Sequence, residues 1–163
     1  MSRAFTKESD DAGTELPERA LSEYPNYVTP QGLQQLKLQL EAAEKERSVL
    51  LANKDDALAK QKIAMLERDM RYLSARQVSA IVAEHMPQNA DVVLFGATID
   101  VEDDEGILHQ FMIVGEDEAD ITVNKVSWVS PLAKALIGHK IGESVVWYRP
   151  AGNLNLEIIA VHY

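Results

Sequence analysis

Residues 29–77 read TPQGLQQLKLQLEAAEKERSVLLANKDDALAKQKIAMLERDMRYLSARQ and carry the strongest structural pattern in the chain. Thr29-Pro30 offers a capping hydroxyl followed by proline at the first helical position, which predicts a helix start. Mostly apolar residues then recur at alternating spacings of three and four, the heptad pattern of a coiled-coil helix. The two rows are Leu33, Leu36, Leu40, Ala43, Arg47 and Leu50, and then Ala59, Ile63, Leu66, Met70, Leu73 and Gln77.

The two rows match each other when the chain folds back on itself. Each position of the first row has a counterpart in the second at a constant sum of residue numbers, as an antiparallel hairpin requires. The pairing puts Asn53-Lys54-Asp55-Asp56 at the tip, where Asn and Asp favour a turn. Two helices packed separately on another domain would need broader apolar faces. We therefore expect a coiled-coil hairpin over residues 29–85, with arms of about 25 residues.

The regions on either side of the hairpin differ in composition. Residues 1–28 are acidic and poor in large apolar groups, so we expect a flexible N-terminal tail. Glycine, proline and β-branched residues return over residues 86–163, which predicts a mostly β domain. The strands are expected at residues 98–102, 107–114, 144–148 and 154–161, with a short helix from 130 to 136. The expected fold is α+β, a helical hairpin followed by an antiparallel sheet with one short helix.

Composition excludes several classes of protein. The 163 residues carry 16 basic and 26 acidic side chains, a net charge of −10, and no cysteine. The absence of cysteine removes disulfides, thiolate metal sites and cysteine nucleophiles. The acidic balance argues against binding duplex DNA by phosphate neutralisation. Since no segment approaches the length of a membrane span, we expect a cytoplasmic monomer that makes no membrane contact.

The usual catalytic and metal-binding motifs are missing. The four histidines are far apart in the sequence and lack the spacing of metal ligands. The acids of Asp103-Asp104-Glu105-Gly106 lack the pattern of a calcium loop, so we expect a hairpin turn there. No nucleophile motif or phosphate-binding loop occurs. We therefore expect no catalytic residue, no metal site and no cofactor within the chain itself.

Several ordered motifs point to a known family. Residues 95–98 read FGAT, residues 113–120 read IVGEDEAD and residues 130–138 read SPLAKALIG. At this spacing they resemble the C-terminal domain of the bacterial transcript-cleavage factors GreA and GreB. Upstream, residues 27–32 (YVTPQG) and 71–73 (RYL) are similar to the two ends of that family's coiled coil. The resemblance covers nearly everything after Tyr27.

The resemblance implies a fold and a partner. It implies an FKBP-like C-terminal domain that docks at the rim of the secondary channel of RNA polymerase, and a coiled coil that enters the channel. Contact with nucleic acid is then expected only within the polymerase complex. We expect the polymerase-binding surface on the IVGEDEAD loop and the start of the short helix, with the acids on an exposed turn; the alternative is a solvated turn without a binding role. The expected residues are Ile113, Gly115, Glu116, Asp117, Glu118, Asp120, Ser130 and Pro131.

The hairpin tip departs from the family pattern. In the family, the tip carries a GDxxEN motif whose two acids hold a second magnesium ion in the polymerase active site. No such motif occurs between Arg47 and Lys60, and the hairpin is shorter than the family's by about fourteen residues, or roughly 10 Å of rod. Asp55 and Asp56 then have two interpretations. In the first, one of them caps the second helix. In the second, the two replace the acids of the missing motif and bind magnesium shared with the polymerase.

The expected function is therefore regulation of transcription elongation by a channel-binding protein that is not itself an enzyme. Three alternatives stay open. The chain is a genuine cleavage factor that uses Asp55 and Asp56, or a short-coil regulator of the type first named for control of nucleoside diphosphate kinase. In a different class, it is an FKBP-like prolyl isomerase or chaperone that acts without polymerase.

Overall fold

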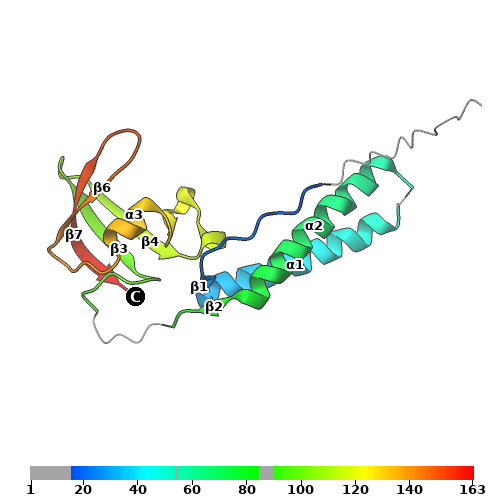
Figure 1. The fold of residues 1–163 in the computed structure, drawn as a ribbon, viewed down its shortest axis with the longest axis horizontal. Helices are drawn as coiled ribbons and strands as arrows, with labels where there is room; N and C mark the ends of the chain where they lie inside the picture. The colour runs from blue at the N-terminus through cyan, green and yellow to red at the C-terminus, as the bar shows by residue number, and fades with distance from the viewer. Residues whose placement is uncertain (1–15, 54, 85–89) are drawn as a thin grey trace, which may run out of the picture.

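A computed structural model describes residues 16–53, 55–84 and 90–163. Figure 1 shows a long two-helix rod on one side and a curled sheet with a short helix on the other. The expected α+β fold is confirmed. The predicted domain boundary between residues 85 and 86 lies outside the described residues. Among the described residues, no helix is long and apolar enough to cross a membrane.

The rod is the antiparallel hairpin of α1 (Pro30–Leu51) and α2 (Ala57–Ser79). Thr29 caps α1, because its side-chain oxygen accepts a hydrogen bond from the Gly32 amide at 3.0 Å. Asp56 caps α2 by accepting from the Leu58 amide at 3.1 Å. The helices have 22 and 23 residues, so the rod extends for about 33 Å at 1.5 Å per residue.

The contact between the two helices is apolar at the base of the hairpin and includes an ion pair nearer the tip. Leu36 and Leu73, which the row pairing predicts to face each other, lie in one buried cluster with Val28. Further along, the guanidinium of Arg47 donates to the carboxylate of Glu67 at 2.8 Å, one turn from the predicted counterpart Ile63. A long charged side chain such as that of Arg47 can extend to a carboxylate one turn away from its predicted partner. Residue spacing alone does not predict this.

The second half of the chain forms a five-stranded sheet in the order β5-β4-β3-β7-β6. The strands are β3 (Thr98–Asp103), β4 (Leu108–Val114), β5 (Lys125–Ser127), β6 (Ser144–Trp147) and β7 (Leu154–His162). The prediction of a purely antiparallel sheet is wrong at one edge, where β4 and β5 pair in parallel. The sequence predicts four or five strands but does not locate β5, because a strand of three residues is too short to show an alternating pattern.

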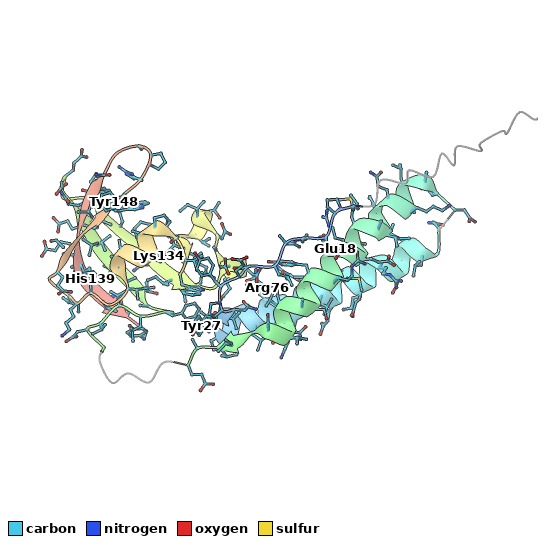
Figure 2. The ribbon with its side chains drawn as sticks, viewed as in Figure 1. Glu18, Tyr27, Arg76, Lys134, His139 and Tyr148 are labelled. Atoms are coloured by element: carbon cyan, nitrogen blue, oxygen red, sulfur yellow. The ribbon has the colours of Figure 1, made fainter. Side chains whose placement is uncertain are left out.

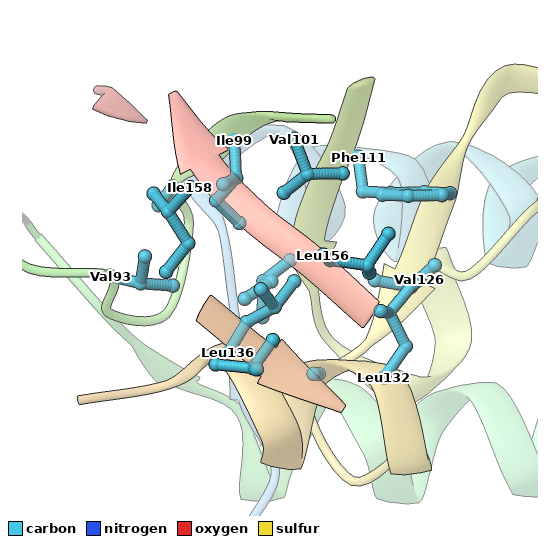
Figure 3. Close-up of a cluster of buried hydrophobic side chains, with 13 residues drawn as sticks. Val93, Ile99, Val101, Phe111, Val126, Leu132, Leu136, Leu156 and Ile158 are labelled. Carbon is cyan, nitrogen blue, oxygen red and sulfur yellow. The ribbon is translucent and has the colours of Figure 1, made fainter. Parts of the chain in front are cut away.

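The short helix α3 (Pro131–Leu136) closes the core of this domain. Leu132 and Leu136 point into a cluster that also holds Ile99 of β3 and Leu156 and Ile158 of β7 (Figure 3). The other buried members are Val93, Ala97, Val101, Phe111, Ile113, Val126, Ala133 and Val145. Burial of these aliphatic groups stabilises the domain independently of the rod.

The expected tail over residues 1–28 has to be corrected in its second half, and residues 1–15 lie outside the described residues. Residues 16–28 lie along the rod and end in β1 (Tyr27–Val28), which pairs in parallel with β2 (Ile81–Val82). The acidic composition does not reveal this arrangement, because it does not show that Glu18 pairs with Arg71 on α2.

The seam pairing yields a stability prediction. Leu36→Ala and Leu73→Ala should each lower the free energy of unfolding by about 2–4 kcal/mol, because each leaves a cavity in the same cluster. Their combined cost should differ from the sum, since the two side chains share that cluster. Urea unfolding of the single and double variants measures both quantities. The exposed Leu38→Ala on the same helix is the control, with a cost below about 0.5 kcal/mol. Strict additivity would show that the pairing is wrong.

Candidate functional site

The IVGEDEAD run lies where the sheet domain meets the base of the rod. After β4, the chain turns at Gly115 into the short 3-10 helix η1 (Glu116–Glu118), and a second one, η2 (Ile121–Val123), follows. All three acids of η1 face the rod or the segment before it. Figure 2 shows the place, with Arg76 and Tyr27 at the base of the rod.

Glu118 joins the two domains by sharing the cap of α1. Its side chain is only 7% exposed. One carboxylate oxygen accepts from the backbone amides of Thr29 at 3.0 Å and Gly115 at 3.1 Å, and the other accepts from the Thr29 hydroxyl. The Thr29 oxygen meanwhile accepts from Gly32, so the group that starts the helix also holds the sheet domain. A carboxylate with this set of donors is well suited to burial.

Asp117 and Arg76 form a second link beside the first. Arg76 is 3% exposed, and its Nε donates to Asp117 at 2.6 Å while its Nη2 lies 3.7 Å from Glu116. The Tyr72 hydroxyl also donates to Asp117, at 2.5 Å. Burial and then this hydrogen bond raise the pKa of Tyr72 to about 12, so the hydroxyl keeps its proton at neutral pH.

Two glycines allow the domains to approach this closely. A Cβ at Gly32 would lie 2.0 Å from Cδ of Glu118, and a Cβ at Gly115 would lie 2.4 Å from the carbonyl oxygen of Tyr27. Both distances are shorter than any real contact. We call Thr29, Tyr72, Arg76 and the three η1 acids the joint. The joint and the two glycines fix one arrangement of rod and sheet domain.

The sequence prediction placed the acids of this loop on an exposed turn, and that placement is wrong for most of them. Ile113 and Gly115 are buried, and Glu116, Asp117 and Glu118 point to the rod. An acidic run looks the same in sequence whether it faces water or a buried cation. The missed residues are Tyr72 and Arg76 on α2. Arg76 carried a usable signal, since it lies three residues after buried Leu73 and a buried cation requires a carboxylate.

The remaining predicted residues lie on the surface around η2 and the start of α3. Ile121 is 71% exposed and Val123 58% exposed, next to Asp120. Asp120 accepts from the hydroxyl and the amide of Thr122, and these two hydrogen bonds lower the pKa of its carboxyl, which stays charged near neutral pH.

Ser130 and Pro131 open α3 close to this surface along the chain. The Ser130 hydroxyl caps the helix by accepting from the Ala133 amide at 3.2 Å, and Pro131 is exposed. Two exposed apolar side chains beside a carboxylate are a common composition for a protein-binding patch. We call Asp120, Ile121 and Val123 the exposed patch.

At the far end of the rod, the structure describes both acids of the predicted turn. Asp56 is engaged as the cap of α2, and Asp55 is exposed beside it. Lys54, which completes the predicted turn, lies outside the described residues. Within the part of the chain that the structure describes, no three His, Cys, Asp or Glu side chains are grouped as metal ligands.

Comparison with known proteins identifies relatives over most of the chain. Residues 87–163 match the family described as "Transcription elongation factor, GreA/GreB, C-term". Transcription elongation factor GreB of Neisseria meningitidis serogroup B is 35% identical over 157 residues, covering 87% of this chain and 96% of that protein. GreA of Trichlorobacter lovleyi is 35% identical over 162 residues, covering 98% and 96%. The crystal structure of GreA factor homolog 1 of Thermus thermophilus is 25% identical and covers 86% of this chain and all of that one, with a TM-score of 0.43.

The contacts at the joint predict that Gly32→Ala lowers the free energy of unfolding, although the same change inside a helix usually raises it. Replacing glycine by alanine inside a helix normally stabilises it by about 0.5–1 kcal/mol. Here the methyl group would displace the buried Glu118 carboxylate, so we expect the free energy of unfolding to fall by about 1–3 kcal/mol. Urea unfolding measures the change. The exposed Gln34→Ala on the same helix is the control and should be neutral or stabilising. A more stable Gly32→Ala protein would contradict the described joint.

Proposed function

Because the chain belongs to the GreA/GreB family of transcription elongation factors, we propose that it regulates elongation by binding RNA polymerase. The C-terminal domain docks at the rim of the secondary channel, and the helical rod enters the channel. Contact with nucleic acid arises only inside that complex. The chain acts as a monomer, because a single rod fills its role.

The observation that carries this proposal is the fixed connection between rod and docking domain. If the sheet domain binds the polymerase and the tip of the rod acts elsewhere, the connection between them must hold the tip in a defined position. Buried Arg76 and Glu118 tie the base of the rod to the sheet domain through Asp117 and Thr29. Removing one partner of a buried pair of this kind costs about 3–5 kcal/mol, because it leaves the other charge buried and unpaired.

We propose that the rod is a shortened form of the family's coiled coil and works by occupying space. With helices of 22 and 23 residues, its tip would end roughly 10 Å before the position of a full-length acidic tip. A positional error of even 1 Å can reduce a reaction rate by about 100-fold. The rod therefore blocks the channel without reaching the chemistry.

We further propose that the chain has no catalytic centre and holds no metal ion of its own. The capping role of Asp56 supports this proposal, because its carboxylate already accepts the Leu58 amide. Adjacent side chains at the start of a helix leave in different directions, so Asp55 and Asp56 make a poor pair for one ion. The polymerase supplies whatever magnesium chemistry takes place in the complex.

The exposed patch is the proposed docking surface, and Ile121 tests it. Ile121→Asp should weaken binding to core RNA polymerase at least about tenfold, because it puts a charge into the centre of an apolar contact. Stability should hardly change, since Ile121 is exposed. Binding is measured by fluorescence titration with core polymerase. Leu108→Asp, equally exposed at the start of β4, is the matched control. Equal affinities for both variants would move the docking surface elsewhere.

A transcript-cleavage assay tests the action at the channel. Added in excess to halted, backtracked polymerase, the protein should leave the RNA intact. It should also inhibit cleavage by a full-length GreA or GreB in proportion to its concentration. RNA products are resolved on denaturing gels.

The control in this assay removes the tip charges without removing the helix cap. Asp55→Asn with Asp56→Asn should inhibit as well as the parent protein, because Asn caps a helix about as well as Asp. Strong RNA cleavage by the parent protein that disappears in this double variant would overturn the proposal. It would instead identify a genuine cleavage factor that uses the tip acids.

A further inference from the structure

Residues 16–28, which we call the clasp, run along the rod and end in β1 at its base (Figures 1 and 2). The clasp contacts both domains, which distinguishes it from a simple connecting segment. Glu18 and Arg19 contact α2, Ser22 and Tyr24 contact the sheet domain, and Asn26 returns to α2 by donating to the Arg76 carbonyl at 2.7 Å. Its composition predicts a tail instead.

The upstream half of the clasp holds α2. The carboxylate of Glu18 accepts from Arg71 through both of its oxygens, at 3.1 and 3.0 Å from Nε and 2.5 Å from Nη2. The next residue, Arg19, places its guanidinium 3.8 Å from the ring centroid of Tyr72 and 3.4 Å from Asp69. A two-oxygen contact and a stacked guanidinium are geometrically specific for surface interactions.

The downstream half of the clasp holds the sheet domain. The Ser22 hydroxyl donates to Glu116 of η1 at 3.0 Å. The ring of Tyr24 meets Trp128 edge to face, with centroids 5.9 Å apart, and the ammonium of Lys134 on α3 lies 5.4 Å from the same ring. The partners Glu116, Trp128 and Lys134 all belong to the sheet domain.

The clasp thus attaches to the rod further toward the tip than the joint does. The joint contacts α2 at Tyr72 and Arg76, whereas the ion pairs of the clasp are with Asp69 and Arg71, so the attachment extends about 4–5 Å beyond Tyr72 along the helix axis. One point of attachment permits tilting about that point. Two points at different heights, both connected to the sheet domain, resist it.

We infer that the clasp braces the rod against the sheet domain and so fixes the position of the tip. The leverage is large, because a tilt of about 10° at the base of a rod about 33 Å long moves its tip by about 6 Å. The brace itself is a property of the free protein. Its consequence, accurate entry of the rod into a channel, rests on the proposed function.

Distance measurements on the full chain test the brace directly. The chain contains no cysteine, so spin labels attach only at introduced positions, such as the exposed Gln61→Cys near the tip and Leu108→Cys on β4. Double electron–electron resonance then gives the distribution of distances between rod and sheet domain. We expect one narrow distribution for the otherwise unchanged chain.

Both ends of the clasp are tested with matched variants. Glu18→Gln with Arg19→Gln removes the attachment to α2, and Tyr24→Ala removes the ring on the sheet domain; each should widen the distribution about twofold, by the leverage given above. Glu23→Gln, on the same segment and exposed, and Tyr24→Phe, which keeps the ring, should leave it narrow. Circular dichroism confirms that each variant is folded. An unchanged width in either of the first two variants, or equal widening in the controls, would overturn the brace.

Competition with a full-length GreA or GreB for polymerase, measured on the same variants, separates the brace from the proposed function. Weaker competition together with wider distances supports both. Wider distances with unchanged competition would overturn the brace's contribution to channel entry. If the parent protein fails to bind polymerase at all, the proposed function fails while the distance result still decides the brace.

Discussion

The carboxylate of Glu118 is the group on which the arrangement of the two domains depends. It accepts hydrogen bonds from Thr29 and Gly115, so one anion completes the start of α1 and the turn after β4. The first turn of a helix leaves amide donors without partners, and here a side chain from another domain satisfies one of them. The same carboxylate thus completes a local structure in each domain. Because the buried donors have no second acceptor among the described contacts, the two domains cannot separate without exposing them.

In this molecule, charged groups and their hydrogen bonds set the contact between the two domains, whereas most domain contacts depend on apolar burial. A buried ion pair such as Arg76 with Asp117 adds little net stability, since desolvating both groups offsets their attraction. Its geometry is nevertheless narrow, because the guanidinium and Tyr72 both donate to the same carboxylate. An apolar contact would tolerate sliding, whereas these hydrogen bonds specify one orientation. The acidic loop is therefore better explained as a determinant of orientation than as a source of stability.

The parts predictable from sequence were those set by neighbours in the chain. The helix rows, the capping Thr29 and the longer strands depend on short-range periodicity, which the sequence displays directly. The joint depends on contacts between residues 41 to 89 positions apart, and no local pattern distinguishes a solvated acid from Asp117. The clasp was missed for the same reason, because Glu18 appears solvated until Arg71 is placed beside it. At the tip, residue spacing left a helix cap and a substitute magnesium pair as alternatives, and the structure shows Asp56 as the cap of α2.

The residues that control the tip therefore lie far from it. Substitutions near Asn53 change what the tip presents, but its position is set at the base of the rod, where an angular error is multiplied by the length of the rod. A shorter rod reduces this amplification in proportion, so shortening and bracing act in the same direction. Loosening Arg76 or Glu118 would move the tip without altering any residue there. Under the proposed action by occupying space, the property that these contacts would maintain is accurate placement of the tip.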